Sequence, residues 1–124
     1  MVDPTYILLY VADVAKSVKF YQQILEKDPV EHSAHFALFV LESGLKLGCW
    51  SKAEVEPQAI ITGGGAEVAV TVDTVTAVNM TFEKWKGQGI SILQEPTAME
   101  FGFTFLALDP DGHRLRIFAP NDHE

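Results

Sequence analysis

The sequence has one cysteine, two arginines and no long apolar run, and each scarcity excludes a class of protein. The single cysteine, Cys49, rules out an intrachain disulfide, and we interpret it as a small core residue because no base partner is assigned to it. No apolar run reaches the roughly 18 residues of a membrane helix, and no basic segment precedes a long apolar stretch at the N-terminus. We therefore expect a soluble, cytoplasmic protein that has no membrane partner.

Positive charge is also scarce. The chain has 9 Lys and Arg residues against 17 Asp and Glu, which gives a formal net charge of -8, and its cations form no run. Nucleic acids and anionic membranes need a basic footprint on the proteins that bind them, so a small molecule or another protein is the expected partner. With 124 residues and 48% hydrophobic content, the chain is long enough for one domain over residues 1–124.

Hydrophobic spacing in the first half predicts a strand, a helix and three further strands. A β-branched and aromatic run over Thr5–Val11 ends near Asp13, which is a good helix N-cap. Apolar residues then recur at helical spacing, which predicts a helix over Val14–Leu25. Three short β-like stretches follow, near Pro29–His32, His35–Leu41 and Leu45–Trp50. We expect these elements to form a first module over about residues 5–51.

The same order of elements recurs after a linker over about residues 52–65, which contains Pro57 and three consecutive glycines. The expected second module, about residues 66–119, has a strand over Glu67–Val72 and a helix that Asp73 caps, with its buried stripe at Val75, Val78, Phe82 and Trp85. Its three later strands are expected near Ser91–Gln94, Phe101–Leu108 and His113–Ala119. Setting Asp13 over Asp73 superposes the two copies, which predicts an α+β fold of two βαβββ modules.

The last strand carries both arginines, Arg114 and Arg116, and the period of two places them on one face. On strands one and five, the same alternation separates a polar and aromatic face from a uniformly aliphatic face, and the aliphatic face is expected to lie under the helices. The other face is left for a ligand. It groups Tyr6, Leu8 and Tyr10 on strand one, Lys46, Gly48 and Trp50 on strand four, and Glu67, Ala69 and Thr71 on strand five.

The duplicated unit resembles the vicinal oxygen chelate superfamily, which includes glyoxalase I, extradiol dioxygenases and bleomycin-type resistance proteins. The resemblance rests on residues 11–21 after the first strand and on Asp109-Pro110-Asp111-Gly112 before the last. It implies a curved, half-open mixed sheet whose concave face holds a metal or ligand, with helices on the outer face.

Metal-dependent members of that superfamily place His or Glu on strands one, four, five and eight. The matching positions here hold Tyr6 on strand one, Glu67 on strand five and Arg116 on strand eight, and strand four has no carboxylate or histidine. An arginine cannot coordinate a metal, so we expect no metal site and no cofactor. We predict that an ion pair between Glu67 and Arg116 replaces the metal. We expect the four histidines, His32, His35, His113 and His123, to face solvent.

A closer likeness is to phenazine antibiotic resistance proteins, which are non-enzymatic members of the superfamily. The matching residues run from end to end, from Leu9-Tyr10-Val11 through Lys27-Asp28-Pro29-Val30, Trp50-Ser51, Glu95-Pro96 and Phe101-Gly102 to Asp109-Pro110-Asp111-Gly112-His113. The resemblance implies a homodimer that sequesters a planar aromatic molecule, with Trp50 as the stacking platform. Of Phe101, Phe103 and Phe105, one is expected to reach this pocket. The predicted ligand-binding residues are Trp50, Tyr6, Tyr10, Gly48, Glu67, Phe103 and Arg116.

Three functions stay open on the sequence alone. The leading one is a metal-independent binding protein for a planar hydrophobic aromatic molecule, with no catalytic residue. The alternative is a glyoxalase-like or dioxygenase-like enzyme in which Glu67 is the general base, although a nearby arginine would lower the pKa of that carboxyl and weaken it as a base. The third is an interaction role without a ligand. Trp85, on the apolar stripe of the second helix, is expected in the core in each case.

Overall fold

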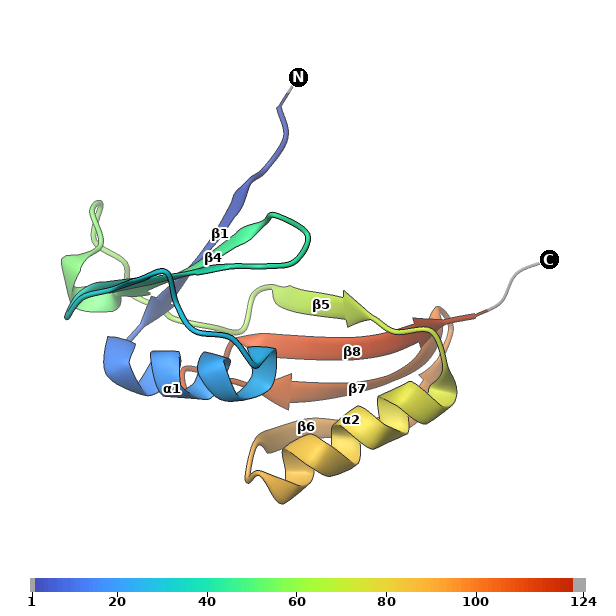
Figure 1. Ribbon diagram of the computed structural model, residues 1–124. Helices are drawn as coiled ribbons and strands as arrows, with labels where there is room; N and C mark the ends of the chain where they lie inside the picture. The colour runs from blue at the N-terminus through green and yellow to red at the C-terminus, as the bar shows by residue number, and fades with distance from the viewer. Residues whose placement is uncertain (1, 122–124) are drawn as a thin grey trace. The chain divides into compact units, whose positions relative to one another are not determined.

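The computed structural model describes residues 2–121 of the chain, which form two compact units that divide between Gly63 and Gly64 (Figure 1). Each unit has the element order βαβββ, so the two predicted modules are confirmed. Each unit also forms its own open, mixed sheet of four strands, with one helix against one face. Within the described residues, neither helix is long and apolar enough to cross a membrane.

The first unit follows the predicted elements closely. Its helix α1 spans Val14–Leu25, and the Asp13 side chain caps it by accepting a hydrogen bond from the backbone N–H of Lys16 at 3.2 Å. The sheet has the order β1-β4-β3-β2, in which β1 and β4 are parallel and the other pairs are antiparallel. The strands are β1 (Tyr6–Val11), β2 (Glu31–His32), β3 (Phe36–Val40) and β4 (Lys46–Ser51), and a short 3-10 helix, Lys52–Glu54, follows β4.

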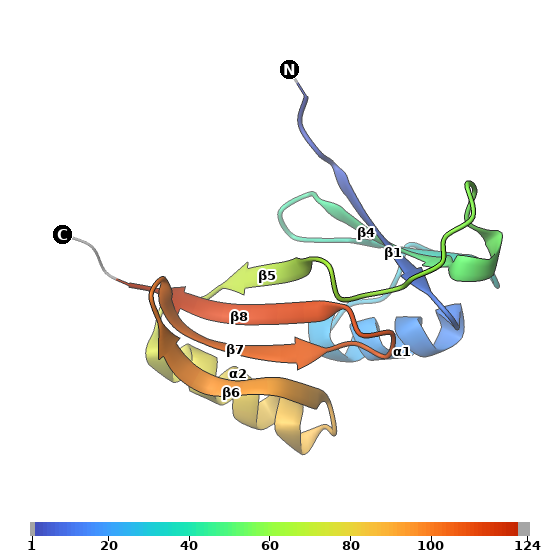
Figure 2. The ribbon, with the colours of Figure 1, turned by 180° about the vertical axis from the view of Figure 1, so that it is seen from behind.

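The second unit repeats this topology with the order β5-β8-β7-β6 (Figure 2). Helix α2 spans Val75–Gly87, and its N-cap is Thr74, whose hydroxyl accepts a hydrogen bond from the backbone N–H of Ala77 at 3.0 Å. The prediction of Asp73 as the cap was wrong by one residue, because the threonine beside it is also a favoured N-cap residue. The strands are β5 (Glu67–Thr71), β6 (Ser91–Met99), β7 (Gly102–Leu108) and β8 (Arg114–Pro120).

Strand β6 is longer than the predicted Ser91–Gln94, since it continues to Met99. Pro96 lies within this longer strand. However, β6 is the edge strand of its sheet, and its pairing with β7 shifts register between Gln94 and Thr97. An edge strand with a bulge tolerates a proline because no partner needs its missing N–H.

The structure aligns the two units with a shift of 61 residues rather than the predicted 60. This shift places Tyr6 of β1 on Glu67 of β5, and the cap Asp13 on the cap Thr74. It also matches Tyr21 with Phe82, which are both buried in their helices. The sheet pairings agree, because Tyr6 pairs with Lys46 and Glu67 pairs with Arg114. Equivalent strand positions can therefore be compared directly.

Each core lies between a sheet and its helix, on the aliphatic face that the alternation predicts. In the first unit, Leu9, Val11 and Phe39 are buried, and so is Cys49. In the second unit, Phe105 on β7 is fully buried, and the rings of Phe82 and Trp85 on α2 meet it edge to face, each at 5.5 Å. The core predictions for Cys49 and Trp85 are thus confirmed.

The helix of the second unit covers its sheet incompletely. Helix α2 packs mainly on β6, β7 and β8 (Figures 1 and 2), and Val70 of the edge strand β5 remains 46% exposed. Val75, the first residue of the predicted stripe, is also exposed. Leu9, the equivalent of Val70 in the first unit, is only 8% exposed. The aliphatic face of β5 was expected to be covered and is only partly so.

The histidines divide into two groups. His32 and His35 are exposed, as predicted. His113 is buried, which corrects the expectation that it faces solvent. It precedes β8 in phase with Leu115 and Ile117, on the face under the helix, and its backbone N–H donates to a carboxylate oxygen of buried Asp109 at 2.8 Å. His123 lies outside the described residues.

Candidate functional site

Arg116 is the centre of a polar network on the face of the second sheet that lies opposite α2. Its Nε donates to Oε1 of Glu67 at 2.6 Å, and its Nη2 donates to Oε2 of the same carboxylate at 2.9 Å. Its Nη1 donates to Oε1 of Gln94 at 3.1 Å and to the Thr104 hydroxyl at 3.2 Å. The predicted ion pair is present, and four of the five N–H donors of this guanidinium are already used.

The ion pair fixes the charge state of both partners. The hydrogen bonds from Arg116 lower the pKa of the Glu67 carboxyl below its ordinary value of 4.5, although burial acts in the opposite direction. The same bonds raise the pKa of Arg116. The side chains are 31% and 15% exposed, so the pair is partly rather than fully buried. Glu67 is therefore a stable carboxylate and a weak general base at neutral pH.

The aromatic residue on this network is Phe101, whereas Phe103, which was predicted to bind the ligand, lies on the other face of the sheet. Phe103 pairs with Ala119 on β8, which places it on the face under α2 together with Phe105. Phe101 precedes β7 in a turn, so strand parity does not apply to it. Its ring centroid lies 5.6 Å from Cζ of Arg116 and 5.7 Å from the ring of Phe118.

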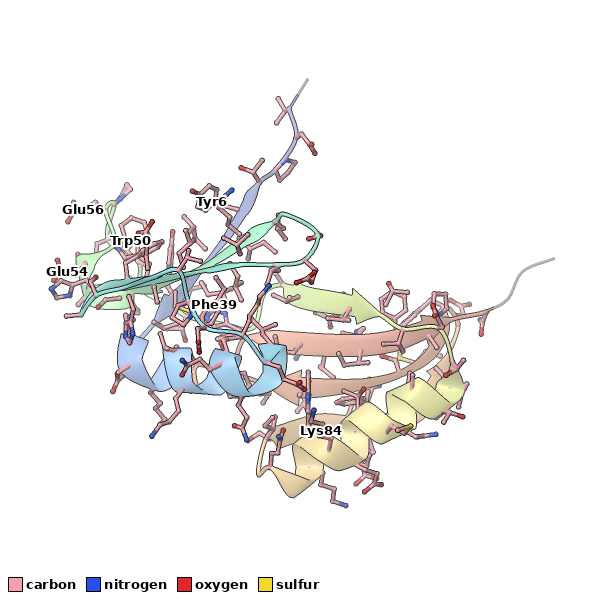
Figure 3. The ribbon with its side chains drawn as sticks, in the orientation of Figure 1. Tyr6, Phe39, Trp50, Glu54, Glu56 and Lys84 are labelled. Atoms are coloured by element: carbon pink, nitrogen blue, oxygen red, sulfur yellow. The ribbon has the colours of Figure 1, made fainter. Side chains whose placement is uncertain are left out.

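The first unit presents an aromatic face at the equivalent positions. Tyr10 and Trp50 are paired across β1 and β4, and their rings meet edge to face at 6.1 Å. At the other end of these strands, Nζ of Lys46 lies 5.4 Å from the ring centroid of Tyr6. Figure 3 shows Tyr6 and Trp50 pointing away from α1, whereas Phe39 points toward it. Tyr6, Tyr10 and Trp50 thus lie on the face that the alternation predicts.

Gly48 does not leave open space on the face beside Trp50. A β-carbon at this position would lie 2.8 Å from Cδ2 of Leu8 and 3.0 Å from the ring of Phe36. Those two side chains close over the glycine. Gly48 therefore makes room for its neighbours and contributes to the shape of the face only through Leu8 and Phe36.

The donor set of these faces does not fit a metal ion. Among the described residues, no three His, Cys, Asp or Glu side chains come together as metal ligands. Both oxygens of Glu67 accept hydrogen bonds from Arg116, and a cation would have to displace that guanidinium. The guanidinium of Arg116 cannot coordinate a metal either, because it has no acceptor atom.

Sequence reasoning missed three residues of these faces, Phe36, Gln94 and Thr104, and it did not single out Phe101 from the three phenylalanines near β7. Phe36 and Thr104 follow from register: Phe36 pairs with Trp50, and Thr104 pairs with Phe118, which alternation places on the same face as Arg114 and Arg116. A register assignment for β3 and β7 would have found both. Gln94 depends on the bulged course of β6, and Phe101 depends on a turn. Alternation carries no signal for either of these two.

Comparison with known proteins gives consistent matches over nearly the whole chain. The family model described as "Glyoxalase/Bleomycin resistance protein/Dioxygenase superfamily" matches residues 4–117. The phenazine antibiotic resistance protein EhpR of Enterobacter agglomerans is 34% identical over 119 residues, which cover 94% of this chain and 91% of the relative.

Two solved structures extend the comparison. A protein of Agrobacterium tumefaciens, determined by NMR in solution, has a TM-score of 0.91 and 49% identity, and the match covers 98% of this chain and all of the other. A glyoxalase-related enzyme from Fulvimarina pelagi has a TM-score of 0.84 at 22% identity, and the match covers 96% of this chain and 88% of the enzyme chain. This last likeness concerns the fold alone.

Proposed function

We propose that this chain, which belongs to the glyoxalase/bleomycin resistance protein/dioxygenase superfamily, functions in resistance by sequestration. It binds a planar hydrophobic aromatic molecule without a metal and leaves that molecule unchanged. The similarity to a phenazine antibiotic resistance protein supports a phenazine-type ligand. The observation that carries the proposal is the uncovered aromatic face of β1 and β4, where Tyr10 and Trp50 form an edge-to-face pair.

The geometry of this face suits a flat ring. An indole held at its edge by a tyrosine keeps a fixed orientation, and a fixed aromatic face binds a planar ring at low cost in conformational entropy. Offset or edge contacts between aromatic rings contribute about 0.5 to 1.5 kcal/mol beyond the area buried. Phe36 and Leu8 extend the apolar surface beside the indole, over Gly48.

The electrostatics favour binding over the enzymatic alternative. A general base needs a pKa near the working pH, and the pKa of Glu67 is lowered by its bonds to Arg116. Withdrawing Glu67 from the pair to accept a proton would leave Arg116 without its anionic partner. We therefore assign Glu67 and Arg116 the role of shaping a polar surface, with no catalytic residue among them.

An open sheet face encloses only one side of a ligand. Small-molecule sites bury most of the surface of their ligands, so a second surface is needed. We propose that a second copy of the chain supplies it and that the protein acts as a homodimer. Sedimentation velocity with and without ligand tests this part, and a species that stays monomeric in both conditions contradicts it.

Calorimetric titration with phenazine-1-carboxamide, in buffer containing EDTA, tests the proposal. We expect saturable binding that Trp50→Ala abolishes and Trp85→Phe retains, because Trp85 lies in the core under the sheet. The compound should be recovered unchanged by chromatography. Binding that requires an added divalent metal, or a compound that is converted, would establish the enzymatic alternative instead.

A further inference from the structure

Lys46 is the one basic residue at the paired positions of the open face in the first unit, as the structure describes it. It pairs with Tyr6 on β1 and with Val40 on β3, and its Nζ lies 5.4 Å from the centroid of the Tyr6 ring. Among the described residues, its side chain makes no hydrogen bond and no ion pair. An ammonium group has three N–H donors, and one ring contact leaves donors for another acceptor.

The described carboxylates of the first unit do not pair with this lysine. Glu31 is the one acidic residue at a paired position of the same face, and it lies on the edge strand β2, in the row of Gly48 rather than that of Lys46. Glu42, in the turn between β3 and β4, accepts a hydrogen bond from Lys27 at 3.4 Å. The half-buried Lys46 side chain therefore has no carboxylate within ion-pair distance in the described part of the chain.

Lys46 and Trp50 lie on the same face of the same strand. They are four residues apart on β4, which corresponds to about 13 Å at the usual rise of a strand. Between them lies Gly48, which Leu8 and Phe36 cover, so the surface that joins them is apolar. A flat molecule that stacks on Trp50 and extends along β4 over this surface meets a cation at its far end. All of these residues belong to one sheet.

We infer that Lys46 binds a carboxylate of the ligand that stacks on Trp50, so that the protein prefers an aromatic acid to the corresponding amide. The inference rests on the proposed function and adds the chemical class of the ligand and the residue that selects it. The flexible stem of a lysine lets its ammonium group turn from the Tyr6 ring toward an anion without a change in the backbone. The resulting contact is a charge-assisted hydrogen bond, which is stronger than the bond that a neutral amide forms.

The test compares phenazine-1-carboxylate with phenazine-1-carboxamide by calorimetric titration of the full chain at neutral pH. The wild type should bind the carboxylate about fivefold or more tightly, as expected for a hydrogen bond between charged groups at a partly exposed site. In Lys46→Gln this preference should disappear, while the affinity for the carboxamide stays within about twofold. Lys46→Arg keeps the positive charge and should keep the preference. Circular dichroism checks that both variants fold.

The matched control is Lys19→Gln, which removes the same charge from an exposed position of α1, on the opposite side of the same sheet (Figure 3). It should keep the preference of the wild type. A preference that is absent from the wild type, that survives in Lys46→Gln or that falls equally in Lys19→Gln overturns the inference and leaves the proposed function intact. An equal loss of affinity for both phenazines in Lys46→Gln also overturns it, because the lysine would then only support the face. A wild type that binds neither phenazine overturns both.

Discussion

The two units have the same topology but present different chemistry on their open faces. At equivalent positions, the first unit has Tyr6 with Lys46 and the second has Glu67 with Arg114. The next position on the same face of the sheet is Gly48 on β4 and Arg116 on β8. One copy of the repeat therefore offers an aromatic surface and the other a hydrogen-bonding surface.

This difference shows how a duplicated fold divides its tasks. The helix-facing positions stay apolar in both units, because burial under a helix constrains them. The positions on the open faces have no such constraint. There the first unit has Gly48, which Leu8 and Phe36 cover, and the second unit has Arg116, which donates four hydrogen bonds. Shared core positions explain the fold, and the divergent positions carry the function that we propose.

Truncating equivalent core positions should affect the two units unequally, and this is the largest effect we expect. Leu9→Ala should lower the free energy of unfolding by about 3 kcal/mol, because it leaves a cavity under α1. Val70→Ala should cost no more than about 0.5 kcal/mol, since Val70 is 46% exposed on an edge strand. Chemical denaturation of both variants measures the difference. Equal losses would mean that the face of β5 is covered as completely as that of β1.

Adding a methyl group to a glycine in each unit gives the next largest contrast. A β-carbon at Gly102 would collide with the backbone carbonyl oxygen of Ala119 and lie 2.9 Å from Cα of Pro120. Gly102→Ala should therefore cost about 2 to 3 kcal/mol, because backbone of the neighbouring strand must move.

Gly48→Ala is the matched variant, and it should cost less than about 1 kcal/mol, because overpacking is relieved when the exposed Leu8 side chain rotates away. Thermal unfolding monitored by circular dichroism separates the two variants. A larger loss for Gly48→Ala than for Gly102→Ala would contradict this account of the aromatic face.

How much of this comparison the sequence predicts depends on the kind of position. Strand alternation correctly placed Tyr10, Trp50 and Arg116 on the open faces, because a buried aliphatic face specifies register strongly. It could not place Phe101 or Gln94, because a turn and a bulge interrupt the period of two. Neither could it show that Leu8 and Phe36 cover Gly48, which depends on side-chain conformations.

Removing the charge of Glu67 should have a smaller effect than the core changes. Glu67→Gln should lower the free energy of unfolding by about 1.5 kcal/mol, at the low end for hydrogen bonds to charged groups, because the pair is partly exposed. The loss is smaller than the 3 to 5 kcal/mol that a fully buried pair costs when it is broken. Glu95→Gln, at an exposed position of β6, is the control and should be neutral. Equal effects of the two variants would show that the ion pair does not stabilise the fold.

The contribution of the ion pair to the free energy of unfolding should also depend on pH, and this is the smallest effect in the series. The pKa of Glu67 is lowered in the folded protein, so its contribution is fully present above the unfolded value near 4.5 and is lost as the pH falls through the folded value. The stability difference between wild type and Glu67→Gln should be constant from neutral pH down to about pH 5.5 and shrink below pH 4.5. Denaturant titrations across this range measure it. A difference that grows on acidification would contradict the sign of the shift.

One measurement tests most directly the claim that the aromatic face of β1 and β4 binds a planar ring. The chain has two tryptophans, so a ¹⁵N-labelled sample gives two indole signals. During titration with phenazine-1-carboxamide in EDTA, the indole signal of Trp50 should shift and saturate, whereas that of Trp85 should move little, because Trp85 lies in the core. A shift confined to Trp85, or no saturable shift in either signal, would contradict the account.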